Sequence, residues 1–279
     1  MAGNPGLAKS VIARAFGIAR STLYARPRQP AKDKIILEAV LTVLEEHPHY
    51  GYRRVAMALK TNKKPIQRIM KKYGLKPKRR RKHLRKQADE RAPPSEIQNR
   101  LKHLCPIQPN AVWAGDFTHF AWHGTYLYVA TVIDVYTREI IGIAMGLHHS
   151  SQLVIAALND AKEKRWSLPD LFHSDQGSEY ASRDCKLWLM AHTVLPSHSQ
   201  KAHPWENGRQ ESFYGKFKHE LGNIYRFASL EELMAGIYRQ IHYYNTKRIH
   251  SRLKMPPRQF HDHTLRRRED NKKHLSTGV

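Results

Sequence analysis

The sequence is poor in cysteine and in acidic residues, and each shortage narrows the classes of protein to which it can belong. Its 279 residues include only 2 cysteines, Cys105 and Cys185, without any Cys-x-x-Cys pair. Neither a disulfide framework nor a zinc finger can be built from them, so we expect a protein of the reducing cytoplasm. The 24 acidic residues are outnumbered by 48 lysines and arginines, which gives a formal net charge of +24. This excess favours a polyanionic partner.

The sequence also lacks a long apolar run. Its longest stretch without Asp, Glu, Lys or Arg, residues 140–159, is interrupted by polar residues from His148 to Gln152, which the centre of a bilayer would penalise. The first 16 residues lack the basic start and apolar centre of a signal peptide. We therefore predict no membrane segment and no export. The 41% of hydrophobic residues suffice for a core, and the length suggests two domains, or one with an appendage.

The charge is unevenly distributed along the chain. Residues 1–103 contain 26 basic and 7 acidic residues, residues 104–215 contain 8 and 11, and residues 216–279 contain 14 and 6. Solubility alone does not require the 8 lysines and arginines within residues 76–86, which include Arg79, Arg80 and Arg81. We predict that this run contacts phosphates and belongs to a basic linker over residues 77–108.

Two helix-turn-helix patterns precede the linker. The first is a short segment over residues 1–30, with a turn at Gly17 and a helix start at Ser21. The second covers residues 31–76, where Pro65 opens a helix that stops at Gly74. The outer face of that helix carries Gln67, Arg68, Lys71 and Lys72. Such a helix can enter the major groove of DNA, and a small helical bundle with a solvated face is the alternative.

The middle of the chain has the pattern of an α/β layer. Residues 111–120, 126–134 and 138–145 are β-branched and aromatic runs that predict a three-stranded meander. Helical and extended segments then alternate, ending with a helix over residues 206–221. The predicted helices are residues 151–164, 185–191 and 206–221, and the predicted strands between them are residues 171–174 and 193–197.

Acidic residues inside or at the ends of buried strands are costly unless they are paired or bind a metal, which singles out Asp116 and Asp175. Asp134 lies in a hairpin turn, where an aspartate bonds to nearby backbone, so we predict a structural role for it. On the last helix Glu211 and Lys218 are 7 positions apart and share a face, with Asn207 and Tyr214 beside them. The carboxylate would point toward a metal and the ammonium toward a phosphate, or both would be merely solvated.

Taken in order, three motifs resemble those of a known family. They are Pro109 to Trp113 leading into Asp116-Phe117-Thr118, then His173 to Tyr180, and last Glu206 to Tyr214, with 35 residues between Asp175 and Glu211. The chain resembles the DDE transposases and retroviral-type integrases, and most closely the OrfB part of the bacterial insertion-sequence transposases of family three. His49 to Arg53 and Tyr244 to His250 match further signatures of that family.

The resemblance implies a ribonuclease H-like integrase catalytic core over residues 109–265, preceded by an all-α helix-turn-helix DNA-binding region and followed by a basic tail over residues 266–279. In this fold Asp116, Asp175 and Glu211 are the catalytic residues and the ligands of two Mg²⁺ ions, for which Mn²⁺ can substitute. The implied activity is metal-dependent cleavage and strand transfer of DNA during transposition and integration. The expected DNA contacts are Lys218, Asn207, Arg248, Arg68, Lys71, Lys72, Arg79, Arg80 and Arg81.

The resemblance also implies partners: the terminal repeats of the element, target DNA, further copies of the chain bound on DNA, and an upstream-frame OrfA protein or fusion. We expect a nucleoid-associated protein of a bacterial cytoplasm, without a membrane partner. Two departures from the family pattern are Gly115 before Asp116, where threonine is usual, and Glu206-Asn207-Gly208 in place of Asp-Asn-Ala. The role of His173 stays open, as a contact to DNA or beside the metal, and the retroviral zinc module is absent.

Two other functions fit part of the sequence. A helix-turn-helix regulator with a non-catalytic core would explain the basic flanks but has no need of Asp116, Asp175, Glu211 and Lys218 together. A ribonuclease or junction nuclease on the same core would explain the carboxylates but not the tandem N-terminal units.

Overall fold

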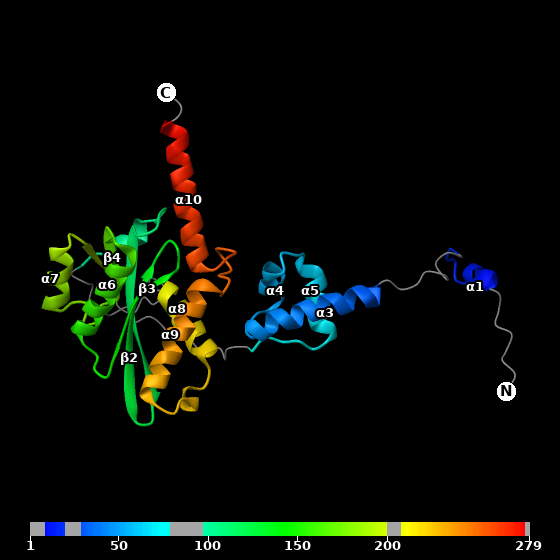
Figure 1. Ribbon diagram of the computed structural model, residues 1–279, viewed down its shortest axis with the longest axis horizontal. Helices are drawn as coiled ribbons and strands as arrows, with labels where there is room; N and C mark the ends of the chain where they lie inside the picture. The colour runs from blue at the N-terminus through cyan, green and yellow to red at the C-terminus, as the bar shows by residue number, and fades with distance from the viewer. Residues whose placement is uncertain (1–8, 20–28, 79–96, 200–207, 277–279) are drawn as a thin grey trace. The chain divides into compact units, whose positions relative to one another are not determined.

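The computed structural model describes residues 9–19, 29–78, 97–199 and 208–276, and the chain forms two compact units, residues 1–78 and residues 79–279 (Figure 1). The first unit is helical, with α1 (Lys9–Ala15), α3 (Gln29–Glu46), α4 (Tyr52–Ala58) and α5 (Lys63–Lys72). Helix α1 ends before Gly17, whose φ of 62° makes the predicted turn, while the helix expected from Ser21 begins outside the described residues.

Helices α3, α4 and α5 pack around a small core. The side chain of Asn62 caps α5 by accepting a hydrogen bond from the N–H of Lys64, and Gly74 follows the helix with a φ of 66°. Ile66 and Ile69 are buried on the inner face of α5, and Val40 and Val55 are buried on α3 and α4. The predicted helix and its stop are therefore confirmed.

The second unit contains a five-stranded sheet in the order β3-β2-β1-β4-β5. The long strands β1 (Val112–Trp122), β2 (Thr125–Asp134) and β3 (Ile140–Gly146) form the predicted antiparallel meander. The short strands β4 (Leu171–Ser174) and β5 (Leu195–His198) continue the sheet in parallel with β1. His123 and Gly124, with φ angles of 44° and 79°, form the tight turn of the β1–β2 hairpin.

Helices cover both faces of this sheet (Figure 1). Helices α6 (Ser151–Arg165) and α7 (Arg183–Ala191) pack with one buried cluster, and α8 (Gly208–Leu221) and α9 (Leu230–Thr246) pack with the other. Helix α6 approaches β3 so closely that a Cβ on Gly142 would lie 2.1 Å from the carbonyl oxygen of Ala157. The short 3₁₀ helices are Arg100–His103 and Ile224–Arg226, and α10 (Pro257–Ser276) contacts α9.

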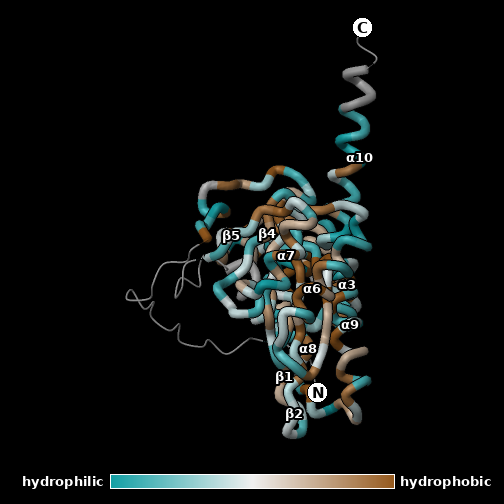
Figure 2. The backbone as a smooth tube through the Cα atoms, turned by 90° about the vertical axis from the view of Figure 1, so that its left-hand side faces the viewer, coloured by the Kyte–Doolittle hydropathy of each residue, from teal (hydrophilic) through white to brown (hydrophobic). Residues whose placement is uncertain are grey.

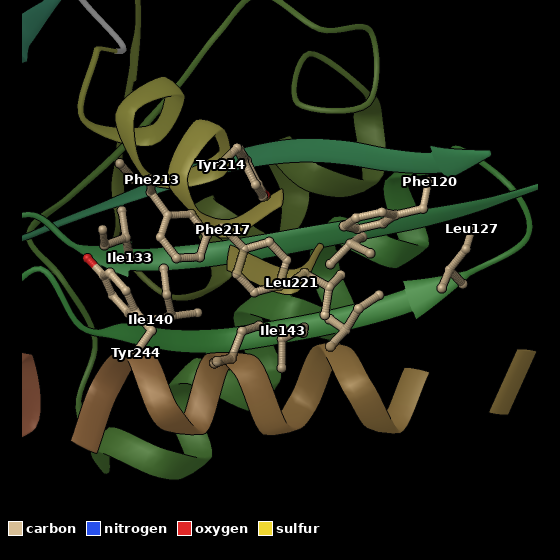
Figure 3. Close-up of a cluster of buried hydrophobic side chains, with 14 of the residues drawn as sticks. Phe120, Leu127, Ile133, Ile140, Ile143, Phe213, Tyr214, Phe217, Leu221 and Tyr244 are labelled. Atoms are coloured by element: carbon tan, nitrogen blue, oxygen red, sulfur yellow. The ribbon is translucent and has the colours of Figure 1, made fainter. Parts of the chain in front are cut away.

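The core beneath α8 is rich in aromatic side chains (Figure 3). Phe213 and Phe217 point from α8 toward the sheet and are 4% and 3% exposed, so this helix buries its phenylalanines. Hydrophobic residues gather in the strands and the packed helices, whereas α10 is mostly hydrophilic (Figure 2). Within the described part of the chain, no helix has both the length and the apolar character of a membrane span.

Candidate active site

Asp116 and Asp175 lie at equivalent distances past the paired part of the neighbouring strands β1 and β4. Strand β1 pairs in parallel with β4, and the last paired residues are Ala114 and His173. Asp116 follows Ala114 by two residues, and Asp175 follows His173 by two residues. Two residues rise by about 6.6 Å along an extended chain, so both aspartates lie just past the point where the pairing of the two strands ends.

Asp116 is half-buried, and hydrogen bonds fix the backbone around it. Its Oδ1 accepts a hydrogen bond of 2.8 Å from the N–H of Phe117, and its carbonyl oxygen accepts one of 2.8 Å from the hydroxyl of Tyr214. The same Tyr214 hydroxyl lies 2.6 Å from Oγ1 of Thr131 on β2. These bonds fasten α8 to the strand that carries Asp116.

Asp175 begins a turn directly after β4. Its Oδ1 accepts a hydrogen bond of 3.0 Å from the N–H of Gly177, and its carbonyl oxygen accepts one of 3.0 Å from the hydroxyl of Ser174. The amide of Gln176 donates to the carbonyl oxygen of Ser199 at 3.1 Å, which ties the turn to the end of β5.

Tyr180 is a buried residue whose pKa is affected by the charges of both aspartates. Burial, and next the negative charge of Asp116, raise the pKa of Tyr180 well above its ordinary value, and Asp175 adds to the rise. A Cβ on Gly115 would lie 2.4 Å from the ring of Phe172 and 3.1 Å from that of Tyr180. The glycine that departs from the family pattern therefore makes room for two buried aromatic rings.

A further carboxylate near the site escaped the sequence analysis. Glu179 is only 8% exposed, its Oε1 lies 3.2 Å from Nε2 of His149, and a Cβ on Gly177 would lie 2.4 Å from that same oxygen. The residue thus packs over the turn that begins at Asp175. Glu179 was named only as part of a motif, because no sequence pattern pairs it with a histidine 30 positions away.

Helix α8 includes Glu211, three residues before Tyr214, although the Glu211 side chain is outside what the structure describes. Asn207 lies outside the described residues altogether, as do Arg79, Arg80 and Arg81. Among the side chains that are described, no group of three or more His, Cys, Asp and Glu could hold a metal ion. Asp116 and Asp175 nevertheless supply the donor chemistry that a hard divalent cation needs, namely carboxylate oxygens.

Lys218 lies one turn beyond Tyr214 on α8. Its Nζ donates a hydrogen bond of 2.8 Å to the carbonyl oxygen of His119 and lies 5.1 Å from the centre of the Phe120 ring. Burial lowers the pKa of Lys218, and the negative charge of Asp116 opposes that effect. The ammonium of Lys218 is therefore within electrostatic range of the Asp116 carboxylate.

Arg248 is 3% exposed and is held by Glu220, with its Nε 2.7 Å and its Nη2 2.7 Å from the carboxylate oxygens. A contact of Arg248 with DNA would require this buried ion pair to open. His173 is also buried, and its Nδ1 lies 3.0 Å from Oγ of Ser197 on β5. Asp134 accepts hydrogen bonds from the N–H groups of Asn110, Tyr136 and Thr137, which confirms its predicted structural role.

In the N-terminal unit, two of the expected DNA-binding residues hold the helices together. Arg68 on α5 donates hydrogen bonds of 2.9 and 2.6 Å to the carboxylate of Asp33 on α3, and Lys72 donates one of 3.1 Å. Asp33 is 2% exposed, whereas the Arg68 and Lys72 side chains keep 43% and 50% of their surface accessible. Lys71 points outward on the same helix. A role of Arg68 and Lys72 in DNA binding would thus be combined with a structural one.

Asp33→Asn is expected to loosen α3 from α5 at neutral pH. The hydrogen bonds from Arg68 and Lys72 lower the pKa of Asp33 to about 2, below its ordinary value, although burial opposes them. A pKa that is lower in the folded state stabilises the fold above about pH 4, and this contribution is lost as the pH falls toward 2. Hydrogen exchange of the α5 amides in the full chain, corrected for intrinsic rates, should be faster in the variant at pH 7 and should converge with the wild type near pH 2. Glu38→Gln, an exposed change on α3, is the control, and equal protection of Asp33→Asn and wild type at pH 7 would contradict the prediction.

Comparisons with known proteins agree with this architecture. Residues 106–204 and residues 192–257 match integrase core domains, and residues 30–83 match a helix-turn-helix-like domain. The chain is 34% identical to the transposase for insertion sequence element IS904 of Lactococcus lactis, over 83% of this chain and 95% of that protein. It is 31% identical to the putative transposase InsK for insertion sequence element IS150 of Escherichia coli, over 86% and 88% of the two chains.

Among solved structures, the simian T-cell lymphotropic virus intasome in complex with PP2A regulatory subunit B56 gamma superposes with a TM-score of 0.50. The sequence identity is 16%, and the match covers 78% of this chain and 73% of that one. This likeness shows the fold alone. It confirms the predicted ribonuclease H-like integrase core, preceded by a helical region.

Proposed function

Since the chain belongs to the insertion-sequence transposases of family three, we propose that it binds element-end DNA and catalyses its cleavage and strand transfer with Asp116, Asp175 and Glu211. The observation that supports the assignment of residues is the β1–β4 register, in which Asp116 and Asp175 each follow the last paired residue of their segment by two positions. Glu211 would join them from α8, because residues three apart on a helix share a face and Tyr214 bonds to the backbone of Asp116.

An integrase core implies dependence on a divalent metal, and we propose that the three carboxylates hold two Mg²⁺ ions, with Mn²⁺ as a substitute. When bound, such a pair stabilises the charge that develops on the attacking and leaving oxygens of a phosphodiester. The protein contributes the negative charges and fixes them: the backbone N–H groups of Phe117 and Gly177 orient the two aspartates. Lys218 would place its ammonium against a DNA phosphate near Asp116. No side-chain nucleophile is required.

The proposed DNA contacts outside the core are the exposed side of α5, with Lys71, Arg68 and Lys72, and the basic run that contains Arg79, Arg80 and Arg81. Sequence-independent phosphate contacts of this kind position the protein, and base contacts by the helix select the element end. We further propose that several copies assemble on DNA, that the activity is enhanced by an upstream-frame OrfA protein or fusion, and that the protein works at the bacterial nucleoid. A regulator with an inactive core is the alternative.

The proposal predicts nicking of supercoiled plasmid by the full chain in Mg²⁺ or Mn²⁺. Chelation of the metal should abolish nicking and leave much of the binding to DNA, because the helical unit and the basic run need no metal to contact phosphates. Agarose gels would measure nicking, and gel shifts would measure binding. Nicking that persists after chelation would contradict the metal dependence. Binding without nicking, both with and without an added OrfA protein, would favour the regulator.

A further inference from the structure

The segment that joins α9 to α10, residues 247–256, is basic and lies in a stretch of the chain without carboxylates (Figure 1). Residues 233–261 contain 6 lysines and arginines and no acidic residue. Four of the 6 lie within the joining segment, namely Lys247, Arg248, Arg252 and Lys254. The counter-charges of these side chains therefore have to come from other elements or from a ligand.

Hydrogen bonds close the middle of this segment into a tight turn, residues 250–255, which we call the basic turn. The N–H of His250 donates a hydrogen bond of 3.1 Å to the carbonyl oxygen of Met255. The N–H of Lys254 donates one of 2.8 Å to the carbonyl oxygen of His250. Arg252 and Lys254 are exposed. The basic turn therefore presents two cations to the solvent from a backbone that its own hydrogen bonds hold.

Two buried arginines lie near the basic turn, and Tyr244 contacts both of them. The hydroxyl of Tyr244 donates a hydrogen bond of 3.1 Å to the carbonyl oxygen of Arg138, and its ring centre is 5.7 Å from the guanidinium carbon of Arg248. Arg138 and Arg248 are 9% and 3% exposed. Glu220 of α8 holds Arg248 at 2.7 Å, and Lys216 precedes Glu220 by one turn on the same face of α8. The β2–β3 turn, α8 and the end of α9 thus bring cations to one place.

The imidazole of His250 lies within electrostatic range of four of these cations. Its pKa is lowered to about 4 by burial and, after burial, by the charges of Lys216, Arg138, Arg248 and Arg252. A histidine with that pKa is neutral at pH 7 and adds no charge of its own. The charged groups that shift this pKa are all cations, so the local potential is positive. Bringing like charges together costs free energy, and a bound anion would relieve that cost.

The carboxylates closest to this group along the chain and in space are already engaged. Glu220 holds Arg248. Asp134 and Glu139 lie on either side of Arg138 in the sequence, but Asp134 accepts hydrogen bonds from three backbone N–H groups and Glu139 holds two other arginines. The single negative charge of Glu220 therefore stands against four cations, and the place keeps an excess of positive charge.

We propose that the basic turn, together with Lys216, binds a backbone phosphate of duplex DNA. This inference rests on the proposed function and deepens it, since it adds a DNA contact apart from the three carboxylates and from the N-terminal unit. The guanidinium of Arg252 can bind two phosphate oxygens at once, and the ammonium of Lys216 adds a point charge. Arg248 keeps its pair with Glu220 and holds the turn in place instead of contacting the phosphate. Such a contact positions the DNA without reading its sequence.

The test measures binding of the full chain to a DNA duplex over a series of KCl concentrations, by fluorescence anisotropy. Each phosphate contact contributes about 0.9 to the slope of log affinity against log salt concentration. Arg252→Ala should therefore reduce the slope by about 0.9, which corresponds to about eightfold weaker binding at 0.1 M KCl relative to 1 M. Lys216→Ala should act in the same direction and serves as a second variant if Arg252→Ala fails to fold.

Two further variants separate a phosphate contact from a general effect of charge. Arg252→Lys keeps the charge and should keep the slope of the wild type. Arg239→Ala removes an exposed arginine from α9 and is the matched control, for which the slope should also stay unchanged. All titrations contain a chelator of divalent metal, so that cleavage plays no part in them, and tryptophan fluorescence would confirm folding.

Equal reductions of the slope by Arg252→Ala and Arg239→Ala would overturn the proposal, because they would show an effect of net charge alone. Unchanged slopes in both Arg252→Ala and Lys216→Ala would overturn it too. This holds also if phosphorus NMR showed that inorganic phosphate binds the wild type and not Arg252→Ala, since the turn would then hold a free ion. A reduced slope without nicking in Mg²⁺ would contradict the proposed cleavage and keep this inference, and nicking with unchanged slopes would do the reverse. The two failures can thus be told apart.

Discussion

Asp175→Asn is expected to lower DNA cleavage and strand transfer by at least about 10³-fold while DNA affinity changes little. A divalent cation takes charged carboxylate oxygens, and a neutral amide in their place holds it far less well. The loss of several kcal/mol of transition-state stabilisation corresponds to about three powers of ten or more in rate. Asp116→Asn and Glu211→Gln should behave in the same way.

The hydrogen bonds of the two aspartates make this test selective for chemistry. Oδ1 of Asp116 accepts from the N–H of Phe117, and Oδ1 of Asp175 accepts from that of Gly177. The carbonyl oxygen of an asparagine can accept the same bond at either position, so the local backbone should keep its conformation in each variant. Plasmid nicking in Mg²⁺ and Mn²⁺ would measure cleavage, gel shifts would measure affinity, and tryptophan fluorescence would confirm folding.

Asp184→Asn, an exposed change at the start of α7, is the matched control and should nick as the wild type does. If any of the three amide variants kept nicking within tenfold of the wild type, the assignment of that residue would be wrong. If all three did so, the nicking would stem from a contaminant or from another site.

The sequence predicted those parts of the fold whose cause is local. The meander follows from three β-branched and aromatic runs, and the Asp134 turn between the second and the third occurs where the sequence predicts it. The buried face of α5 follows from helical spacing, and its ends follow from Pro65 and Gly74. In each case one short segment contains the whole signal. The equivalence of Asp116 and Asp175 is different, because pairing patterns give no register between strands about sixty residues apart. Only the family resemblance predicts that these two aspartates act together.

The contacts that the sequence did not reveal join segments far apart in the chain. Asp33 is separated by 35 residues from Arg68, and Glu179 by 30 residues from His149, so neither pair leaves a pattern in a short window. No helix was assigned after Leu221, although α9 supplies Leu233 and Ile237 to the core. Arg248 is among the residues predicted to contact DNA, since charge alone does not distinguish an arginine that meets phosphate from one that pairs with a buried carboxylate, as Arg248 does with Glu220.

Glu139→Gln is expected to destabilise the catalytic unit by about 3 kcal/mol or more. This is the largest effect on stability that we expect from a substitution that leaves the shape of the side chain unchanged. Glu139 is 3% exposed and holds two arginines, Arg165 at the end of α6 and Arg258 at the start of α10, at 2.5 and 2.7 Å. The Arg165 side chain is only 3% exposed, so the substitution would leave a guanidinium charge buried without a counter-charge. Breaking a buried pair from one side costs about 3–5 kcal/mol, far more than the pair contributes to stability.

The measurement is the midpoint of thermal unfolding, followed by tryptophan fluorescence. This signal reports on the catalytic unit, because all 5 tryptophans lie after residue 79. A loss of about 3 kcal/mol should lower the midpoint by about 6–12 °C for a unit of this size. Arg258→Gln should cost much less, because the Arg258 side chain is 51% exposed and water solvates the charges that remain. Glu163→Gln, an exposed change on α6, is the control and should leave the midpoint where it is. If Glu139→Gln shifted the midpoint no more than Arg258→Gln, the buried Arg165 would have found another partner or water, and Glu139 would not be the residue that joins α6 to α10.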